Sequence, residues 1–251
     1  MLETKDAPDF VAERIRARPR LKYIVPSSTP VVCFGDITQA RVITIGINPS
    51  SSEFTKIQGE NRELLRAGER RLSNYESLDF VQGSELSKNQ VDQVWSDCLN
   101  YFDGPFYEKW FSKMEQFVVN PLGASYLERS AAHVDLIQWA TDPLWQEMIN
   151  TDPEEAKKHL AADLPFLLRQ LDELSPDVIF LSGTPVVETL FELFSLDFWG
   201  KTSVEEKRAQ NKLFTGKFKN ALVLGTSMNV PDSHTSNAHR EFLAAWIKNQ
   251  I

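Results

Sequence analysis

The feature that most constrains the fold is a run of β-branched and apolar residues at 42–47 that ends abruptly in Asn48-Pro49-Ser50. Its unbroken apolar character predicts a strand covered on both faces, and the Asn-Pro pair predicts a rigid polar turn at its end. A second polar cluster, residues 229–236, follows the apolar run 221–225 and precedes an amphipathic segment. Because open α/β sheets bind ligands beyond the carboxyl ends of their strands, we expect the two loops to face one pocket.

Strand and helix patterns alternate along the chain, which predicts an α/β fold. The expected strands cover residues 30–36, 41–47, 131–137, 177–181 and 221–225. The expected helices cover residues 9–18, 84–102, 107–119, 152–174, 186–196 and 237–249, with Pro165 kinking or dividing the fourth. This order predicts a three-layer α/β/α sandwich with a mostly parallel central sheet. We expect one domain over residues 1–251, with residues 1–25 as an N-terminal helical extension.

Two of these helices carry specific local signals. The segment Asp152-Pro153-Glu154-Glu155 places an N-cap residue, a proline at the first helical position and an acid suited to a capping box. The helix at 84–102 carries an apolar stripe that predicts a face packed in the core. Its members are Val91, Val94, Trp95, Cys98, Leu99 and Phe102.

Composition excludes several classes of protein. A chain of 251 residues with 42% hydrophobic content can bury a large core. The start of the chain lacks a signal-peptide pattern, and no apolar run is long enough to cross a bilayer, so we expect a cytoplasmic protein without membrane contact. Cys33 and Cys98 are too few for a cysteine-rich metal site and are expected to be small core residues. We expect a monomer that uses no metal or other cofactor.

The net charge of -8 argues against broad, nonspecific attraction to nucleic acid. Two stretches, residues 13–22 and 201–219, each carry a local net charge of +4. Each is either a solvated surface or a local DNA contact. Arg66, Arg70 and Arg71, in the long polar segment 51–83, are further candidates for phosphate contacts.

The segment Gly46-Ile47-Asn48-Pro49-Ser50 resembles a motif of the uracil-DNA glycosylase superfamily, which places Gly-x-Asn-Pro-Gly after its first core strand. The likeness is closest to the mismatch-specific and single-strand-selective branches, with Ser50 replacing the second glycine. The segment 229–236 is similar to the superfamily's second motif, His-Pro-Ser or Asn-Pro-Ser before the last helix. If Asn229 is the matching residue, the loop has an insertion. If His234 matches, the following Pro-Ser is missing.

The resemblance implies a DNA glycosylase that hydrolyses the N-glycosidic bond of uracil or a related damaged base in DNA. It implies that Asn48 positions the hydrolytic water, that residues Gly46, Ile47, Pro49 and Ser50 bind the base, and that Asn229 or His234 stabilises the departing base anion. Such an enzyme needs a placed water on one side of the sugar and preorganised donors around the base on the other.

Extraction of a base from the duplex also requires a stacking ring and a wedge. Phe54 is the candidate for stacking, and the loop 231–236, which includes Ser233, is the candidate wedge and base contact. His133 and Asp135 fall where the superfamily lines its base pocket. A histidine that is simply hydrogen-bonded at a strand start is the alternative interpretation of His133.

Two other functions are open to such a sequence. Gly-Asp-Ser-Leu esterases have superficially similar blocks, but their nucleophilic serine follows Gly-Asp, and here Ile37 follows Gly35-Asp36. The stronger alternative is a non-catalytic protein with a glycosylase fold that binds a nucleotide, a base or a protein partner. Ser50, the irregular second motif and the acidic composition favour that alternative.

Overall fold

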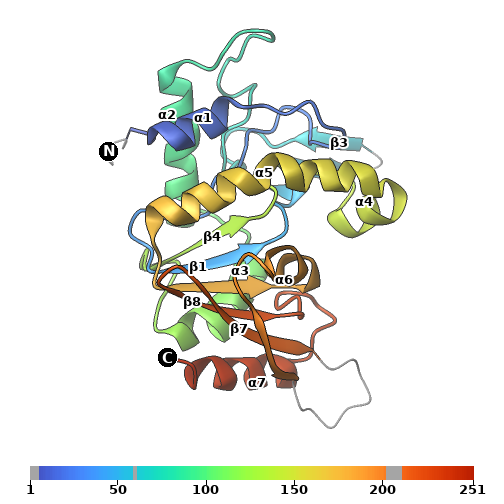
Figure 1. Cartoon of the computed structure of the whole chain (residues 1–251). Coiled ribbons are helices and arrows are strands. Elements are labelled where there is room, and N and C mark those ends of the chain that lie inside the picture. The colour runs from blue at the N-terminus through green and yellow to red at the C-terminus, as the bar shows by residue number, and fades with distance from the viewer. Residues whose placement is uncertain (1–5, 59–60, 202–210) are drawn as a thin grey trace. The chain divides into compact units, whose positions relative to one another are not determined.

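A six-stranded, mostly parallel sheet forms the centre of this α/β protein (Figure 1). The computed structural model describes residues 6–58, 61–201 and 211–251. The sheet has the order β4-β1-β5-β8-β7-β6. Its strands are β1 (Val42–Gly46), β4 (Ala131–Asp135), β5 (Val178–Ser182), β6 (Asp197–Lys201), β7 (Lys212–Phe218) and β8 (Ala221–Thr226). Strands β1, β5 and β8 run parallel, whereas β7 is antiparallel to both β8 and β6. The α/β class and the mostly parallel sheet are therefore confirmed.

The described chain divides into two compact units, each made of three chain segments. Unit 1 comprises the described parts of Met1–Phe34, Asn48–Pro105 and Val134–Glu173. Unit 2 comprises those of Gly35–Ile47, Phe106–His133 and Leu174–Ile251. Strand β4 begins in unit 2 and ends in unit 1. The single domain expected from the sequence stays a prediction.

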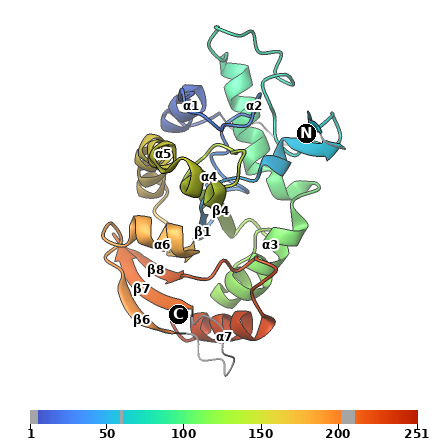
Figure 2. The same ribbon diagram turned by 90° about the vertical axis from the view of Figure 1, so that its right-hand side faces the viewer.

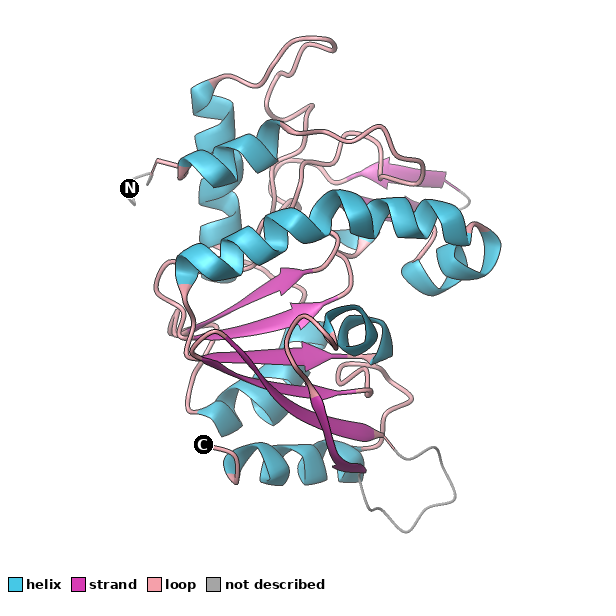
Figure 3. Ribbon diagram, in the orientation of Figure 1, coloured by secondary structure: helices cyan, strands magenta, loops and turns pink. Residues whose placement is uncertain are grey.

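Unit 1 is mainly helical and also contains a small β-hairpin (Figure 3). Its helices are α1 (Asp9–Arg16), α2 (Lys88–Leu99), α4 (Trp145–Thr151) and α5 (Pro153–Leu174). The hairpin pairs β2 (Thr55–Gln58) with β3 (Asn61–Leu64) in antiparallel register. Short helical turns cover Ser51–Glu53 and Tyr101–Asp103.

Local capping explains where the longest helices of unit 1 begin. A capping box joins Ser87 and Gln90 at the start of α2, and the predicted apolar stripe of this helix is buried. At α5, the Asp152 side chain accepts a hydrogen bond from the Glu155 N–H at 3.3 Å. The prediction that Pro165 divides this helix is wrong, because α5 runs as one helix from Pro153 to Leu174. The proline removes one backbone donor, and the buried residues on either side of it keep the helix packed.

Unit 2 holds most of the sheet together with three helices (Figure 2). They are α3 (Glu108–Met114), which continues as a π-helical turn over Glu115–Val119, α6 (Thr184–Leu190) and α7 (Asn237–Lys248). Phe214 of β7 makes ring contacts with Phe191, just beyond α6, whereas Trp199 of β6 contacts Trp246 of α7. Phe198, next to Trp199, contacts Phe214. Trp199 lies at an irregularity in the pairing of β6 with β7, between Phe198 and Gly200.

The structure differs from the predicted elements in other places. Residues 30–36 do not form a named strand. They are a buried, extended segment in which the Val31 N–H bonds to the carbonyl of Gln138. The expected helix 186–196 corresponds to α6, which ends at Leu190. Strands β6 and β7 were not predicted, because β6 is largely exposed and lacks an alternating apolar pattern.

Helices that could cross a membrane are not found among the described residues, because none combines the length and apolar character that a bilayer requires.

Candidate functional site

The side chain of Asn48 is held in one orientation within unit 1. Its Nδ2 donates to Thr141 Oγ1 at 2.9 Å and to the carbonyl of its neighbour Pro49 at 3.2 Å. A carbonyl oxygen can only accept, so the amide nitrogen must face Pro49 and Oδ1 must face the other way. In the described part of the chain, Oδ1 has no hydrogen-bond donor of its own. The half-buried Asn48 therefore presents one oriented acceptor.

Arg62 of the hairpin connects the segment after Asn48 to the segment that orients it. Its NH1 donates to Ser51 Oγ at 2.8 Å and to Thr55 Oγ1 at 3.0 Å. Its Nε lies 2.8 Å from a carboxylate oxygen of Asp142, the residue after Thr141. Both partners of this ion pair are partly exposed, so the pair adds little to stability. Its role is to position the two segments that it joins.

Glu53 is a buried carboxyl group in the same unit, with only 2% of the residue exposed. It accepts hydrogen bonds from the Tyr101 hydroxyl at 2.9 Å and from Arg71 at 3.2 Å. Burial raises the pKa of Glu53, and the nearby charge of Asp135 acts in the same direction, whereas Arg71 and Tyr101 oppose it. Arg71 therefore uses its NH1 group on Glu53, and its role as a phosphate contact stays a prediction.

The other predicted base-binding residues of unit 1 differ in accessibility. Ser50 is half-buried and caps the turn at Ser51–Glu53 by accepting from the Ser52 N–H at 3.2 Å. Pro49 is buried. Phe54 is 1% exposed and Asp135 is 3% exposed. Stacking of a base on Phe54 and base contact by Asp135 stay predictions, and both require a base to reach side chains that are covered in this structure.

Two basic side chains, one from α7 and one from α3, hold the loop Asn229–Ser236 of unit 2. Arg240 of α7 donates from Nε to the carbonyl of Val230 at 2.8 Å and from NH2 to the carbonyl of Asp232 at 2.5 Å. Lys113 of α3 donates from Nζ to the carbonyl of Pro231 at 2.9 Å. Three consecutive carbonyl groups are therefore bound by two side chains, which fixes the loop between β8 and α7 (Figure 2).

This fixed loop exposes the residues that the sequence analysis selected. Asn229, Ser233 and His234 are all exposed. The His234 N–H bonds to Asp232 Oδ1 at 2.8 Å, and Thr235 Oγ1 donates to the carbonyl of Asn229 at 3.0 Å. The imidazole and carboxamide groups thus remain at the surface of unit 2 while their backbone is anchored.

The predicted site residues are distributed over both units. Asn48, Pro49, Ser50, Phe54 and Asp135 belong to unit 1. Gly46, Ile47, Asn229, Ser233 and His234 belong to unit 2. Gly46 is the buried last residue of β1, and Ile47 is half-buried. Convergence of the two loops on one pocket therefore stays a prediction.

His133 has an ordinary structural role in unit 2. Its Nδ1 lies 2.8 Å from Thr44 Oγ1 of β1, and the same hydroxyl lies 2.6 Å from the Tyr126 hydroxyl. The imidazole also contacts the ring of Trp110 edge-on. His133 is buried and hydrogen-bonded, as the structural interpretation expected, but it lies in the middle of β4 rather than at the start of a strand.

The structure describes the first basic segment fully and the second only in part. Arg14 is buried, and its NH2 lies 2.7 Å from Asp163. It therefore cannot contribute to a basic surface. Lys22 pairs with Asp152 at 3.2 Å, and Arg18 lies over the ring of Tyr75. Of the second segment, residues 202–210, which include Lys207 and Arg208, lie outside the described residues.

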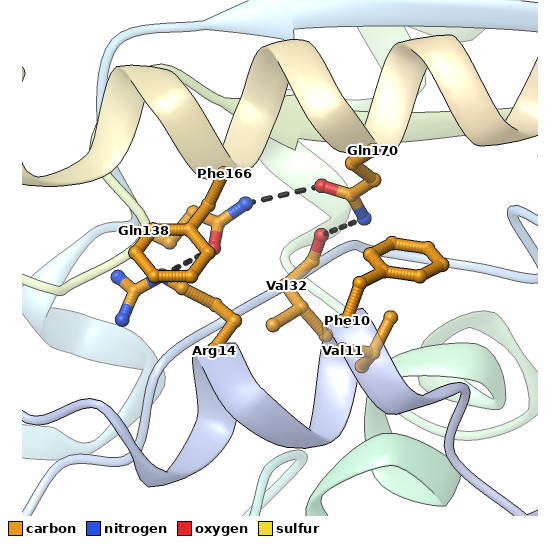
Figure 4. A pocket seen from close by; sticks show the side chains of 7 residues that line it. All are labelled: Phe10, Val11, Arg14, Val32, Gln138, Phe166 and Gln170. Atoms are coloured by element: carbon orange, nitrogen blue, oxygen red, sulfur yellow. Dashed lines mark hydrogen bonds between the residues drawn. The ribbon is translucent and has the colours of Figure 1, made fainter.

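A hollow between α1 and α5 in unit 1 is not a nucleobase site (Figure 4). It measures about 190 Å³ including open solvent, and the enclosed part has room for about one water molecule. Ligand pockets are usually larger, about 300–1,000 Å³. Its polar groups bind one another: Arg14 donates to Gln138, Gln138 to Gln170, and Gln170 to the carbonyl of Val32. The hollow is part of the packing of α1.

Several residues of the two loops were missed by sequence reasoning. Thr141, Arg62 and Glu53 act through partners far away in the chain, so no local pattern reveals them. Arg240 did carry a signal. It lies three residues before Leu243 and seven before Ile247, so an arginine occupies the apolar face of the last helix.

No protein-family model matches this chain, and no curated protein matches it. Among the described residues, no group of three His, Cys, Asp or Glu side chains could hold a metal ion. The structure thus defines an α/β protein with a mostly parallel sheet. The side-chain amide of Asn48 is oriented after β1, and the side chain of Arg240 holds the loop before α7.

Proposed function

We propose that this protein is a DNA glycosylase that hydrolyses the N-glycosidic bond of uracil or a related damaged base, on the three-layer fold of the uracil-DNA glycosylase superfamily. The observation that carries the proposal is the fixed carboxamide of Asn48, whose Oδ1 is left as an acceptor at the start of the loop after β1. The resemblance of residues 46–50 to the superfamily motif assigns the same residue to water positioning.

This hydrolysis does not require a strongly acidic or strongly basic side chain. As the bond between base and sugar breaks, positive charge develops on the sugar and negative charge on the base. A water molecule that donates to Asn48 Oδ1 would be aimed at the electrophilic sugar carbon, which the base leaves with the electron pair of the broken C–N bond. After the water oxygen has bonded to this carbon, its proton would pass to solvent. Donors of the loop 229–236, including the side chain of Asn229 or His234, would stabilise the departing base.

The test is excision of uracil from single-stranded and mismatched DNA by the full chain. We expect Asn48→Ala to reduce the rate of the chemical step by at least about 100-fold, because the water loses its position. The matched control is Asn150→Ala, which removes an exposed carboxamide of α4 outside the loop.

Two outcomes contradict the proposal. If the folded native protein excises no base from either substrate, it is not a glycosylase for uracil. A protein that still binds the oligonucleotide would then fit the alternative of a non-catalytic binding protein. If Asn48→Ala and Asn150→Ala are equally active, Asn48 does not place the water.

A further inference from the structure

Positive charge gathers around the loop 229–236, although the whole chain carries a net charge of -8. Lys109 and Lys113 are four residues apart on α3 and therefore lie on the same helix face. Arg240 of α7 is bound to the same loop as Lys113. The charged groups that act on Lys113 are these two cations and a single carboxylate, Asp232. Around Lys113, the charges of Arg240 and Lys109 are thus opposed by that of Asp232.

Two neighbouring cations act against the charged form of Lys113. Lys113 is half-buried, and its one hydrogen bond to a described residue is to the neutral carbonyl of Pro231. Partial burial, together with Arg240 and Lys109, lowers the pKa of Lys113. Like charges close together at a partly desolvated position destabilise one another. An anionic ligand would relieve this repulsion.

Arg240, Lys109 and Lys113 have different roles. Arg240 is buried and uses its guanidinium on the carbonyls of Val230 and Asp232 and on the side chain of Asn237. It positions the loop. Lys109 is exposed and makes no hydrogen bond or ion pair in the described part of the chain. Lys113 keeps two of its three N–H groups beyond the one used on Pro231.

We propose that Lys109 and Lys113 of α3, beside the anchored loop 229–236, form a contact site for the phosphodiester backbone of DNA. The choice of DNA as the anion rests on the proposed function. The site would hold the strand against the loop that carries Asn229 and His234, with Arg240 as the positioning residue for that loop.

The experiment measures binding of a fluorescently labelled, undamaged single-stranded oligonucleotide by anisotropy, at NaCl concentrations from about 50 to 200 mM. Each phosphate contact contributes about 0.7 to the slope of log K against log salt for single strands. We expect Lys109→Gln and Lys113→Gln each to reduce the slope by about that amount, and the double variant by about 1.4. Lys157→Gln is the control, because Lys157 is exposed in unit 1 and pairs with Glu154.

Equal slopes for the native protein and both lysine variants overturn the proposal, and so does the absence of binding at low salt. Lys109→Gln keeps the test valid if Lys113→Gln disturbs the loop. If polyglutamate binding depends on the two lysines and oligonucleotide binding does not, the site belongs to an acidic protein partner and the proposal is wrong. Excision is measured separately on a uracil-containing strand, so loss of the glycosylase proposal is distinguishable from loss of this site.

Discussion

Asn48 and Glu53 lie in one short loop but differ in their hydrogen bonding. The carboxamide of Asn48 is oriented by Thr141 and leaves an acceptor open, whereas the carboxylate of Glu53 is enclosed by Tyr101 and Arg71. They are only five positions apart in the sequence. The buried Glu53 anchors the loop, and this lets Asn48 keep a fixed position without being buried itself.

The raised pKa of Glu53 leads to a prediction on pH dependence. The folded pKa lies above the ordinary value of 4.5, so between these two values the folded protein binds more protons than the unfolded chain. The contribution of Glu53 to the free energy of unfolding is therefore largest below pH 4.5 and falls as the pH rises through the folded pKa. We expect Glu53→Gln, which cannot titrate, to lack this fall in denaturant titrations.

The comparison is made as the difference between native protein and variant at each pH. Burial also raises the pKa of Asp163, but that group is present in both proteins and cancels in the difference. Glu63→Gln, at an exposed position of β3, is the matched control. A difference that is constant with pH, or that grows as the pH rises, would show that burial does not dominate at Glu53.

At the scale of elements, Gly216 of β7 marks a close approach of two backbone segments. A Cβ atom at this position would lie 2.7 Å from the carbonyl oxygen of Phe194 and 2.9 Å from that of Ser195. The Lys217 N–H bonds to the same Phe194 carbonyl at 3.0 Å, so this segment cannot move away freely. We expect Gly216→Ala to lower the free energy of unfolding by about 1–3 kcal/mol, measured by urea denaturation.

Gly200 of β6 provides the control for this substitution. A Cβ atom there meets nothing within 4 Å, so Gly200→Ala should change stability by less than about 0.5 kcal/mol. Equal effects of the two substitutions would mean that general strand propensity, rather than the contact with residues 194 and 195, sets the cost.

The elements that the sequence predicted are those whose signals are local. Strands β1, β5 and β8 are continuous apolar runs, and α2 and α7 carry apolar residues at helical spacing. Strand β6 has mostly exposed side chains, and its pairing depends on β7. Apolar residues at 30–36 were mistaken for a strand, because burial alone does not distinguish a strand from a packed, extended loop.

The same limit applies to the candidate site. The sequence located Asn48 and the loop 229–236, because Asn-Pro and a polar cluster after an apolar run are local patterns. It could not locate Thr141, which is 93 residues from Asn48, or Lys113, which is 118 residues from Pro231. The orientation of the amide and the anchoring of the loop are products of tertiary structure, so only the folded chain reveals them.

At the scale of the whole molecule, the chain passes five times between the two units, and one of these passages lies inside β4. Unfolding either unit would therefore remove part of a strand that belongs to both. We expect one cooperative transition for the described chain, as the single-domain interpretation of the sequence requires. The two cysteines allow a direct test, because Cys33 and Cys98 are both buried, form no disulfide and belong to unit 1.

The thiols should be unreactive in the native protein and should become reactive together as urea increases. The decisive measurement uses Gly216→Ala, whose effect originates in unit 2. If the units unfold together, this variant lowers the urea midpoint of thiol exposure by the same amount as the midpoint of far-UV circular dichroism. A thiol midpoint that stays at its native value while part of the dichroism signal is lost earlier would mean that unit 1 remains folded alone, and that the chain consists of two domains.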